Sequence, residues 1–248
     1  MCRFCLAVRN TERFFVSWSG TDVTSGCKGR CVARKFLQVP ELIVGFDTET
    51  TGLEVGRERA ISYGFCAYQY GQPIWSEQFY VVPDQPISEG ARRVHGLSVA
   101  DIEAKRDSQS VYSVESGLAH ALEILRVNQS RNAYFVGANL VRFDLEMFRR
   151  SYLSIFAREP DVDGLRFSDM QTIDVIEHDL LIEPSRELRP RRSLGHLCAH
   201  YGVDPGGHDA LNDARATVEV FLEQVLHNNA GQMALDLMTQ SAQQATSR

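Results

Sequence analysis

The sequence predicts an α/β domain with a mixed β-sheet, and three observations support this. Segments rich in β-branched and aromatic residues come first along the chain, and short strand-like runs then alternate with segments of helical periodicity. Glycine and proline bound most of these segments. The chain has 248 residues, of which 44% are hydrophobic, so it can bury a sizeable core, and this excludes disordered and collagen-like chains.

The expected elements begin with three strands. Residues 42–46 are a nearly unbroken apolar run that ends in acidic residues, which is typical of a buried central strand. Residues 61–70 and 77–82 are β-branched and aromatic and read as further strands. Apolar spacing then predicts a helix over 111–125, and a short buried strand follows at 134–138.

The second half alternates helix and strand. Residues 144–156 have an apolar helical face, and 169–175 can form one more strand. Residues 193–201 read as a helix, because Ser193 is a suitable N-cap and Gly202 follows its end. A longer helix is expected over residues 210–226, which carry one apolar stripe.

Charge and cysteine content limit the class of protein. Lysine and arginine number 26 against 32 acidic residues, a formal net charge of −6, so the overall field does not favour an anionic polymer. Contact with nucleic acid would need local arginines or bound cations. Six cysteines are too sparse for a disulfide scaffold, and we identify no apolar run of membrane-spanning length and no secretory signal. We therefore expect a cytoplasmic protein with no membrane partner.

Residues 1–40 read as an N-terminal extension without a long periodic element. Two cysteine pairs in it have roughly the spacing of a structural Zn²⁺ site, at Cys2, Cys5, Cys27 and Cys31. The alternatives are free thiols on a disordered extension, or a start codon assigned too far upstream.

Acidic residues after the first strand predict a cation site. Asp47 and Glu49 are two positions apart, so on a strand they project to the same side. Two carboxylates this close repel unless a cation lies between them, and hard oxygen ligands suit Mg²⁺ or Mn²⁺. The alternative is a strand end with solvated acids that leads into a Thr-Thr-Gly turn.

Two later segments add to this pair of carboxylates. Asp144 opens a predicted helix directly after a buried strand, where an acidic residue is also favoured by the helix dipole alone. His208 precedes the last long helix and Asp213 lies five positions later, inside that helix. His208 and Asp213 can therefore face one cleft.

These segments resemble the motifs of the DEDDh 3′→5′ exonucleases, the family of the proofreading ε subunit of bacterial DNA polymerase III. Residues 46–53 resemble the first motif, 139–144 the second and 208–213 the third, in that order. Residues 94–97 resemble the stretch between the first two motifs that contacts the terminal nucleotide. The likeness spans about residues 41–226, and we take residues 41–227 as the exonuclease domain.

The resemblance implies a ribonuclease H-like fold, with a central mixed sheet flanked by helices. It implies that two Mg²⁺ or Mn²⁺ ions are held by Asp47, Glu49, Asp144 and Asp213, and that His208 is the general base. Two such cations stabilise the attacking and leaving oxygens of a phosphodiester. The residues expected at the 3′-terminal nucleotide are Thr50, Gly52, Leu53, His95, Asn139 and Phe143, although Phe143 fits a buried core position equally well.

The expected activity is removal of mononucleotides from a single-stranded or frayed 3′ end of DNA, in replication proofreading or repair. An exoribonuclease of the ribonuclease T kind is the alternative within the class, since discrimination depends on contacts to the 2′-hydroxyl. A non-catalytic nucleic-acid or clamp-binding module is the alternative of another class.

Residues 228–248 are expected to be a flexible tail, which begins with a break at residues 228–231. The sequence that follows resembles the short peptide by which bacterial replication proteins bind the sliding clamp, with the anchors Gln232, Leu235, Leu237 and Met238. A sliding clamp or a replicative polymerase is therefore an expected partner. The alternative is a final amphipathic turn that packs on the domain.

Overall fold

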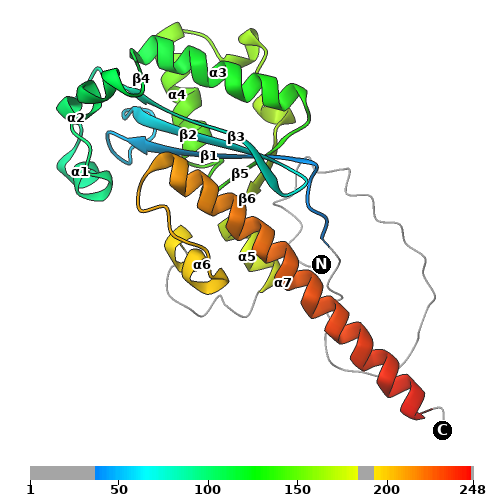
Figure 1. Ribbon diagram of the computed structural model, residues 1–248. Helices are drawn as coiled ribbons and strands as arrows, with labels where there is room; N and C mark the ends of the chain where they lie inside the picture. The colour runs from blue at the N-terminus through cyan, green and yellow to red at the C-terminus, as the bar shows by residue number, and fades with distance from the viewer. Residues whose placement is uncertain (1–36, 184–192, 247–248) are drawn as a thin grey trace.

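A six-stranded mixed sheet in the order β4-β3-β2-β1-β5-β6 forms the centre of the protein (Figure 1). The computed structural model describes residues 37–183 and 193–246. β1, β2 and β3 are antiparallel neighbours, whereas β5 runs parallel to β1, β6 parallel to β5, and β4 parallel to β3. The strands are β1 (Leu42–Thr50), β2 (Ala60–Gln69), β3 (Gln72–Val81), β4 (Ser110–Tyr112), β5 (Tyr134–Gly137) and β6 (Gln171–Asp174).

Helices cover both faces of this sheet. In Figure 1, α3 and α4 lie on one face, α5, α6 and α7 lie on the other, and α1 and α2 lie beyond the end of the sheet. The α-helices are α1 (Glu89–His95), α2 (Val99–Ala104), α3 (Val114–Ser130), α4 (Asp144–Phe156), α5 (Val175–Ile182), α6 (Leu194–Tyr201) and α7 (Ala210–Thr246). Short 3₁₀ turns are η1 (Lys105–Asp107), η2 (Pro160–Asp163) and η3 (Phe167–Asp169). The predicted α/β class with a mixed, helix-flanked sheet is therefore confirmed, and it is consistent with a ribonuclease H-like fold.

Local capping decides several boundaries. The predicted helix over 193–201 is confirmed: the Ser193 hydroxyl accepts a hydrogen bond from the His196 N–H, and Gly202 ends the helix in the left-handed conformation. The helix predicted from residue 111 begins only at Val114, because Ser113 caps it and the preceding residues form β4. The sequence reading missed α1, α2 and α5, which are short.

The flexible break predicted at residues 228–231 is wrong, since α7 continues through it. Asn228 is buried, and the Asn229 side-chain amide exchanges two hydrogen bonds of 2.9 Å with the backbone N–H and C=O of Leu37. Polar residues that read as a linker therefore fasten the helix to the segment before β1, and the sliding-clamp prediction loses the flexible tether on which it rested. Outside the described residues lie Cys2, Cys5, Cys27 and Cys31, and likewise the side chains of Gln232, Leu235, Leu237 and Met238.

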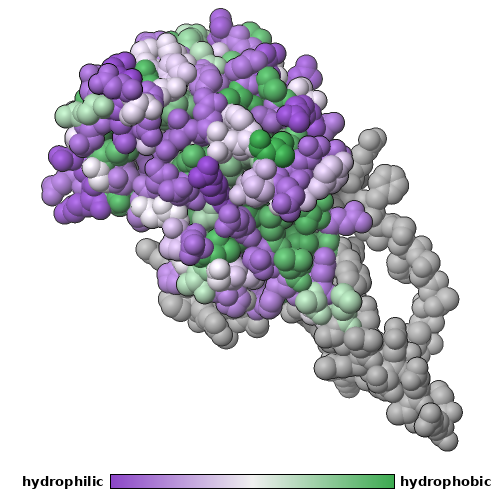
Figure 2. Space-filling model, viewed as in Figure 1, coloured by the Kyte–Doolittle hydropathy of each residue, from purple (hydrophilic) through white to green (hydrophobic). Residues whose placement is uncertain are grey.

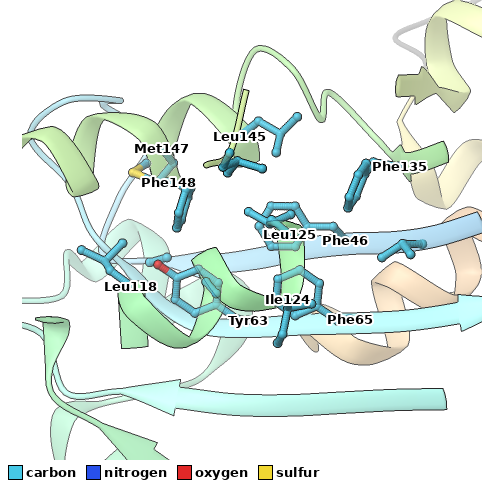
Figure 3. Close-up of a cluster of buried hydrophobic side chains, with 14 of the residues drawn as sticks. Phe46, Tyr63, Phe65, Leu118, Ile124, Leu125, Phe135, Leu145, Met147 and Phe148 are labelled. Atoms are coloured by element: carbon cyan, nitrogen blue, oxygen red, sulfur yellow. The ribbon is translucent and has the colours of Figure 1, made fainter. Parts of the chain in front are cut away.

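An aromatic cluster under α3 and α4 sets the position of the central strands. Phe46 of β1 stacks on Phe65 of β2 with ring centroids 4.6 Å apart, and Tyr63 of β2 stacks on Phe79 of β3 at 4.8 Å. Figure 3 shows this cluster between the sheet and the covering helices. Because side chains alternate along a strand, burying Phe46 on this face turns its odd-numbered neighbours in β1 toward α7.

The face of the molecule turned to the viewer in Figure 2 is mostly polar. On this face, a hydrophobic group lies over the middle of α7. Within the described ranges, no helix has both the length and the hydrophobicity needed to cross a membrane.

Two glycines bring the start of α7 onto the sheet. A Cβ atom at Gly64 of β2 would lie 2.2 Å from the backbone carbon and oxygen of Ala210, and one at Gly45 of β1 would lie 2.6 Å from the Ala214 carbonyl oxygen. Only glycine permits such close approach of a helix backbone to a strand. Asp213 lies between Ala210 and Ala214 in α7, so these two contacts determine the distance between Asp213 and β1.

We expect Gly64→Ala to displace the first turn of α7, because the clash is with backbone atoms. Overpacking of this kind costs about 1–3 kcal/mol, which lowers the melting temperature by several degrees. The matched control is Gly195→Ala in α6, where nothing lies within 4 Å of the new Cβ and helix propensity improves. Equal melting temperatures of the two variants, measured by circular dichroism, would contradict the role given to Gly64.

Candidate active site

The end of β1 carries the first two acidic residues of the site. Asp47 and Glu49 have the same parity along the strand as Gly45, which contacts α7, so both project toward the α7 side. Glu49 is buried, with 8% of its surface exposed, and Asp47 is partly buried. The predicted projection of the two carboxylates to one side is therefore found in the fold.

Asp144 is fixed beside the same strand by Thr48. The Thr48 backbone N–H and hydroxyl both donate to Oδ1 of Asp144, at 3.0 and 2.7 Å. Asp144 is the first residue of α4 and is 2% exposed. The two hydrogen bonds hold the start of α4 against β1, at the strand end that carries Asp47 and Glu49.

The loop before α7 brings the last two predicted residues to this point. A Cβ at Gly206 would lie 2.2 Å from Oδ1 of Asp213, so the loop wraps closely over the first turn of α7. Burial raises the pKa of Asp213, whereas the charge of His208 and hydrogen bonds from the backbone N–H groups of His208 and Gly206 lower it. His208 has φ +62°, in the left-handed region that non-glycine residues seldom occupy.

The structure brings all five predicted residues to one end of the sheet. Ligand atoms of Glu49, His208 and Asp213 lie within 4.8 Å of one another and could hold a metal ion. Asp144 is close enough that its charge raises the pKa values of both Asp47 and Glu49. Residues more than 160 positions apart along the chain thus form a single acidic cluster.

Burial and mutual repulsion disturb the titration of this cluster. Burial raises the pKa of Glu49 to about 8, with repulsion from Asp213 and Asp144 added to it. Burial also raises the pKa of Asp144 to about 7, against the opposing hydrogen bonds from Thr48. The pKa values of Asp47 and Asp213 are raised as well, first by burial. Adjacent buried carboxylates of this kind suit divalent cations, which remove the repulsion.

His95 connects α1 to the acidic cluster. Its Nδ1 accepts a hydrogen bond from the Leu97 N–H at 3.0 Å, so Nε2 carries the proton and donates to the Thr50 carbonyl oxygen at 3.2 Å. Burial lowers the pKa of His95, and the nearby His208 lowers it further. His95 is therefore a neutral imidazole that holds α1 beside the end of β1.

The Thr-Thr-Gly turn after β1 presents one exposed apolar side chain. Thr50 donates from its hydroxyl to the Gly52 carbonyl oxygen at 2.7 Å, and Thr50 and Gly52 are both buried. A Cβ at Gly52 would lie 2.9 Å from Cδ of Glu58, so a larger residue here would have to displace the Glu58 side chain. Leu53 is 85% exposed and is free to contact a ligand.

Asn139 and Phe143 shape the entry to α4. Asn139 has φ +60°, and its carbonyl oxygen accepts hydrogen bonds from the N–H groups of Arg142 and Phe143. Phe143 is partly buried and packs against the aromatic cluster under α3 and α4. Of the two alternatives for Phe143, a stacking residue or a core residue, the contacts in the structure therefore support the core residue.

Asp209 is a fifth carboxylate that the sequence reading missed. Its Oδ1 accepts from the Asn212 N–H at 3.1 Å, and its Oδ2 accepts from Nε2 of Gln78 at 2.8 Å. Its charge raises the pKa values of Asp47, Glu49 and Asp213. The sequence did contain a signal for a structural role of Asp209, because it directly precedes a predicted helix and aspartate is a favoured N-cap.

Comparisons with known proteins agree with this geometry. A solved structure of exonuclease I superposes with a TM-score of 0.64 at 21% identity and covers 79% of this chain and 43% of that chain. The zinc-bound Escherichia coli exonuclease I complex with single-stranded DNA gives a TM-score of 0.62 at 19% identity (79% and 42%). The enzyme of Methylocaldum szegediense gives 0.61 at 20% (77% and 41%), so this chain spans less than half the length of each. A search of curated proteins found no match. The RNase_T exonuclease model matches residues 44–221, and the chain therefore belongs to this exonuclease family.

Proposed function

We propose that this protein is a 3′→5′ exonuclease that removes mononucleotides from single-stranded DNA. The observation that carries the proposal is the meeting of Glu49, His208 and Asp213 within 4.8 Å, beside the partly buried Asp47 and the buried Asp144. The fold and family supply the phosphodiesterase context for that cluster. A cluster with these residue types suits hydrolysis of a phosphate ester better than acyl transfer, because it offers metal ligands and a base rather than a nucleophilic side chain.

The four carboxylates fit a pair of Mg²⁺ or Mn²⁺ ions. Burial raises the pKa of each of the four, and repulsion from neighbouring carboxylates adds to it for Asp47 and Glu49. Their oxygens are the hard ligands that such cations prefer. When bound, the cations neutralise charge on the phosphate and lower the pKa of a nucleophilic water. The residues that would hold them are Asp47, Glu49, Asp144 and Asp213.

His208 supplies the base in this proposal. Its side chain is exposed and lies next to Glu49 and Asp213, so a water that approaches the phosphate from solvent can pass its proton to the imidazole. His95 has a different part: its Nε2–H is already donated to Thr50, and it orients the strand end rather than accepting a proton.

The 3′ terminus would lie against the turn after β1. Leu53 is exposed beside the buried Thr50 and Gly52, and it is available to pack on the last base. One structural neighbour is a complex with single-stranded DNA, which favours that substrate here. Bound cations would offset the net charge of −6 when an anionic strand binds. Replication proofreading or repair is the process we propose, and an exoribonuclease is the second candidate.

The test uses matched DNA and RNA oligonucleotides labelled at the 3′ or the 5′ end, with and without a terminal mismatch, in Mg²⁺ or Mn²⁺. We expect immediate release of a labelled mononucleotide from 3′-labelled DNA and a descending ladder from 5′-labelled DNA. Faster degradation of RNA would favour the exoribonuclease. Persistence of every substrate would favour a non-catalytic binding module and would contradict the proposal.

A further inference from the structure

Gln78 and Asp209 form a polar link between the sheet and the loop before α7. Gln78 lies on β3, and its Nε2 donates to Oδ2 of Asp209 at 2.8 Å and lies 3.4 Å from the Ser62 hydroxyl. The other Asp209 oxygen caps α7 through the Asn212 N–H. Because both oxygens already accept hydrogen bonds, Asp209 acts as part of the scaffold although it lies beside the acidic cluster.

This link is one of the anchors of a strained loop. Gly207 and His208 are consecutive left-handed residues, with φ of +74° and +62°. A non-glycine residue in that region costs on the order of 1 kcal/mol or more and persists only when its surroundings hold it there. The tight contact of Gly206 with Asp213 holds the loop on one side of His208, and Asp209 holds it on the other.

We propose that Gln78 is a positioning residue for His208, acting through Asp209. The inference rests on the proposed function, since it assigns Gln78 a part in the step for which His208 is the base. The donor from Gln78 keeps the Asp209 side chain in place, and the backbone that joins Asp209 to His208 then holds the imidazole beside Glu49 and Asp213. Positioning of this kind affects the chemical step more than substrate binding.

A second contact between β3 and α7 provides the matched control. The Arg215 guanidinium donates to the Ser76 hydroxyl at 2.8 Å, two residues along the strand from Gln78. This bond also fastens α7 to β3, but it lies beyond Asp213 and does not touch the loop that carries His208. Ser76→Ala therefore removes a contact between β3 and α7 and leaves the link to Asp209 intact.

The experiment compares Gln78→Glu, Gln78→Ala, Ser76→Ala and the exchanged pair Gln78→Glu/Asp209→Asn in the full chain. Gln78→Glu loses the donor at nearly constant volume, whereas the exchanged pair restores the hydrogen bond, because the introduced asparagine donates to the introduced glutamate and still caps α7. We expect both single Gln78 variants to lower kcat about 10- to 100-fold with KM within about 2-fold. The exchanged pair and Ser76→Ala should stay within about 3-fold of wild-type kcat.

Melting temperatures and steady-state kinetics separate the outcomes. Gln78→Ala introduces no charge, so it keeps the test valid if Gln78→Glu fails to fold. Single Gln78 variants with wild-type kcat, or an exchanged pair no more active than Gln78→Glu, would overturn the inference. A kcat loss in Ser76→Ala as large as in Gln78→Ala would overturn it too, because helix docking alone would then explain both. An inactive wild-type protein would instead refute the proposed function.

Discussion

Replacing Asp47 by asparagine is expected to abolish hydrolysis and to stabilise the metal-free protein. The change removes a proposed cation ligand, and the loss of several kcal/mol of charge stabilisation corresponds to about 10³-fold or more in kcat. It also removes a partly buried carboxyl group whose pKa is raised by burial and by repulsion from Asp144, Asp213 and Glu49. We expect the melting temperature in a chelator to rise, by about 2–4 °C for each kcal/mol of repulsion relieved.

The pH dependence of stability tests the same electrostatics. The pKa values of Glu49 and Asp144 are raised to about 8 and about 7, so the folded protein binds protons that the unfolded chain has released. The free energy of unfolding of the metal-free protein should therefore fall as the pH rises from about 4 to about 8. Asp47→Asn should flatten this fall, and so should added Mg²⁺. The control is Asp161→Asn on the exposed η2 segment.

A different result would contradict this electrostatic interpretation. If Asp47→Asn melts below wild type in the chelator, the carboxylate stabilises the metal-free fold and is not held under repulsion. If the variant retains hydrolysis, Asp47 does not hold a required cation. Circular dichroism melts between pH 4 and 8, with and without Mg²⁺, give the first result, and the oligonucleotide assay gives the second.

The second large effect is expected for His208→Gln. Loss of a positioned general base lowers kcat by about 10²- to 10⁴-fold. Because the acidic ligands remain, we expect the variant to bind Mn²⁺ and single-stranded DNA as the wild type does. The matched control is His120→Gln on α3, where the imidazole contacts Glu77 on the opposite face of the sheet.

His208 is also close enough to Glu49 and Asp213 to serve as a metal ligand. A ligand role would lower Mn²⁺ affinity in His208→Gln in parallel with kcat, whereas a base role leaves the affinity unchanged. Calorimetric titration of the variant distinguishes the two. Unchanged kcat in His208→Gln would remove this residue from the reaction altogether.

The parts of the site that follow from local rules could be predicted. Alternation along β1 placed Asp47 and Glu49 on one side, and the acidic start of α4 placed Asp144. The α6 boundaries followed from Ser193 and Gly202, because both caps are local. In each case the sequence neighbours of a residue are enough to determine its position.

The parts of the fold and the site that depend on contacts between distant residues could not be predicted from the sequence. Nothing around Gly64 indicates that Ala210 rests on it, since the two are 146 positions apart in the chain. The link from Gln78 to Asp209 joins residues 131 positions apart. Asn229 read as part of a flexible break because its partner, the backbone of Leu37, lies 192 positions away. In each case a contact with a residue far along the chain determines the structure, and the neighbouring sequence does not reveal that contact.

The most direct measurement is the number of divalent cations that the acidic cluster binds. We would titrate the full chain with Mn²⁺ by calorimetry in the presence of thymidine 5′-monophosphate, alongside Asp213→Asn. We expect two Mn²⁺ ions for each wild-type chain and the loss of at least one in the variant. Absence of stoichiometric binding to the wild type, or identical binding by Asp213→Asn, would contradict the joint cation site.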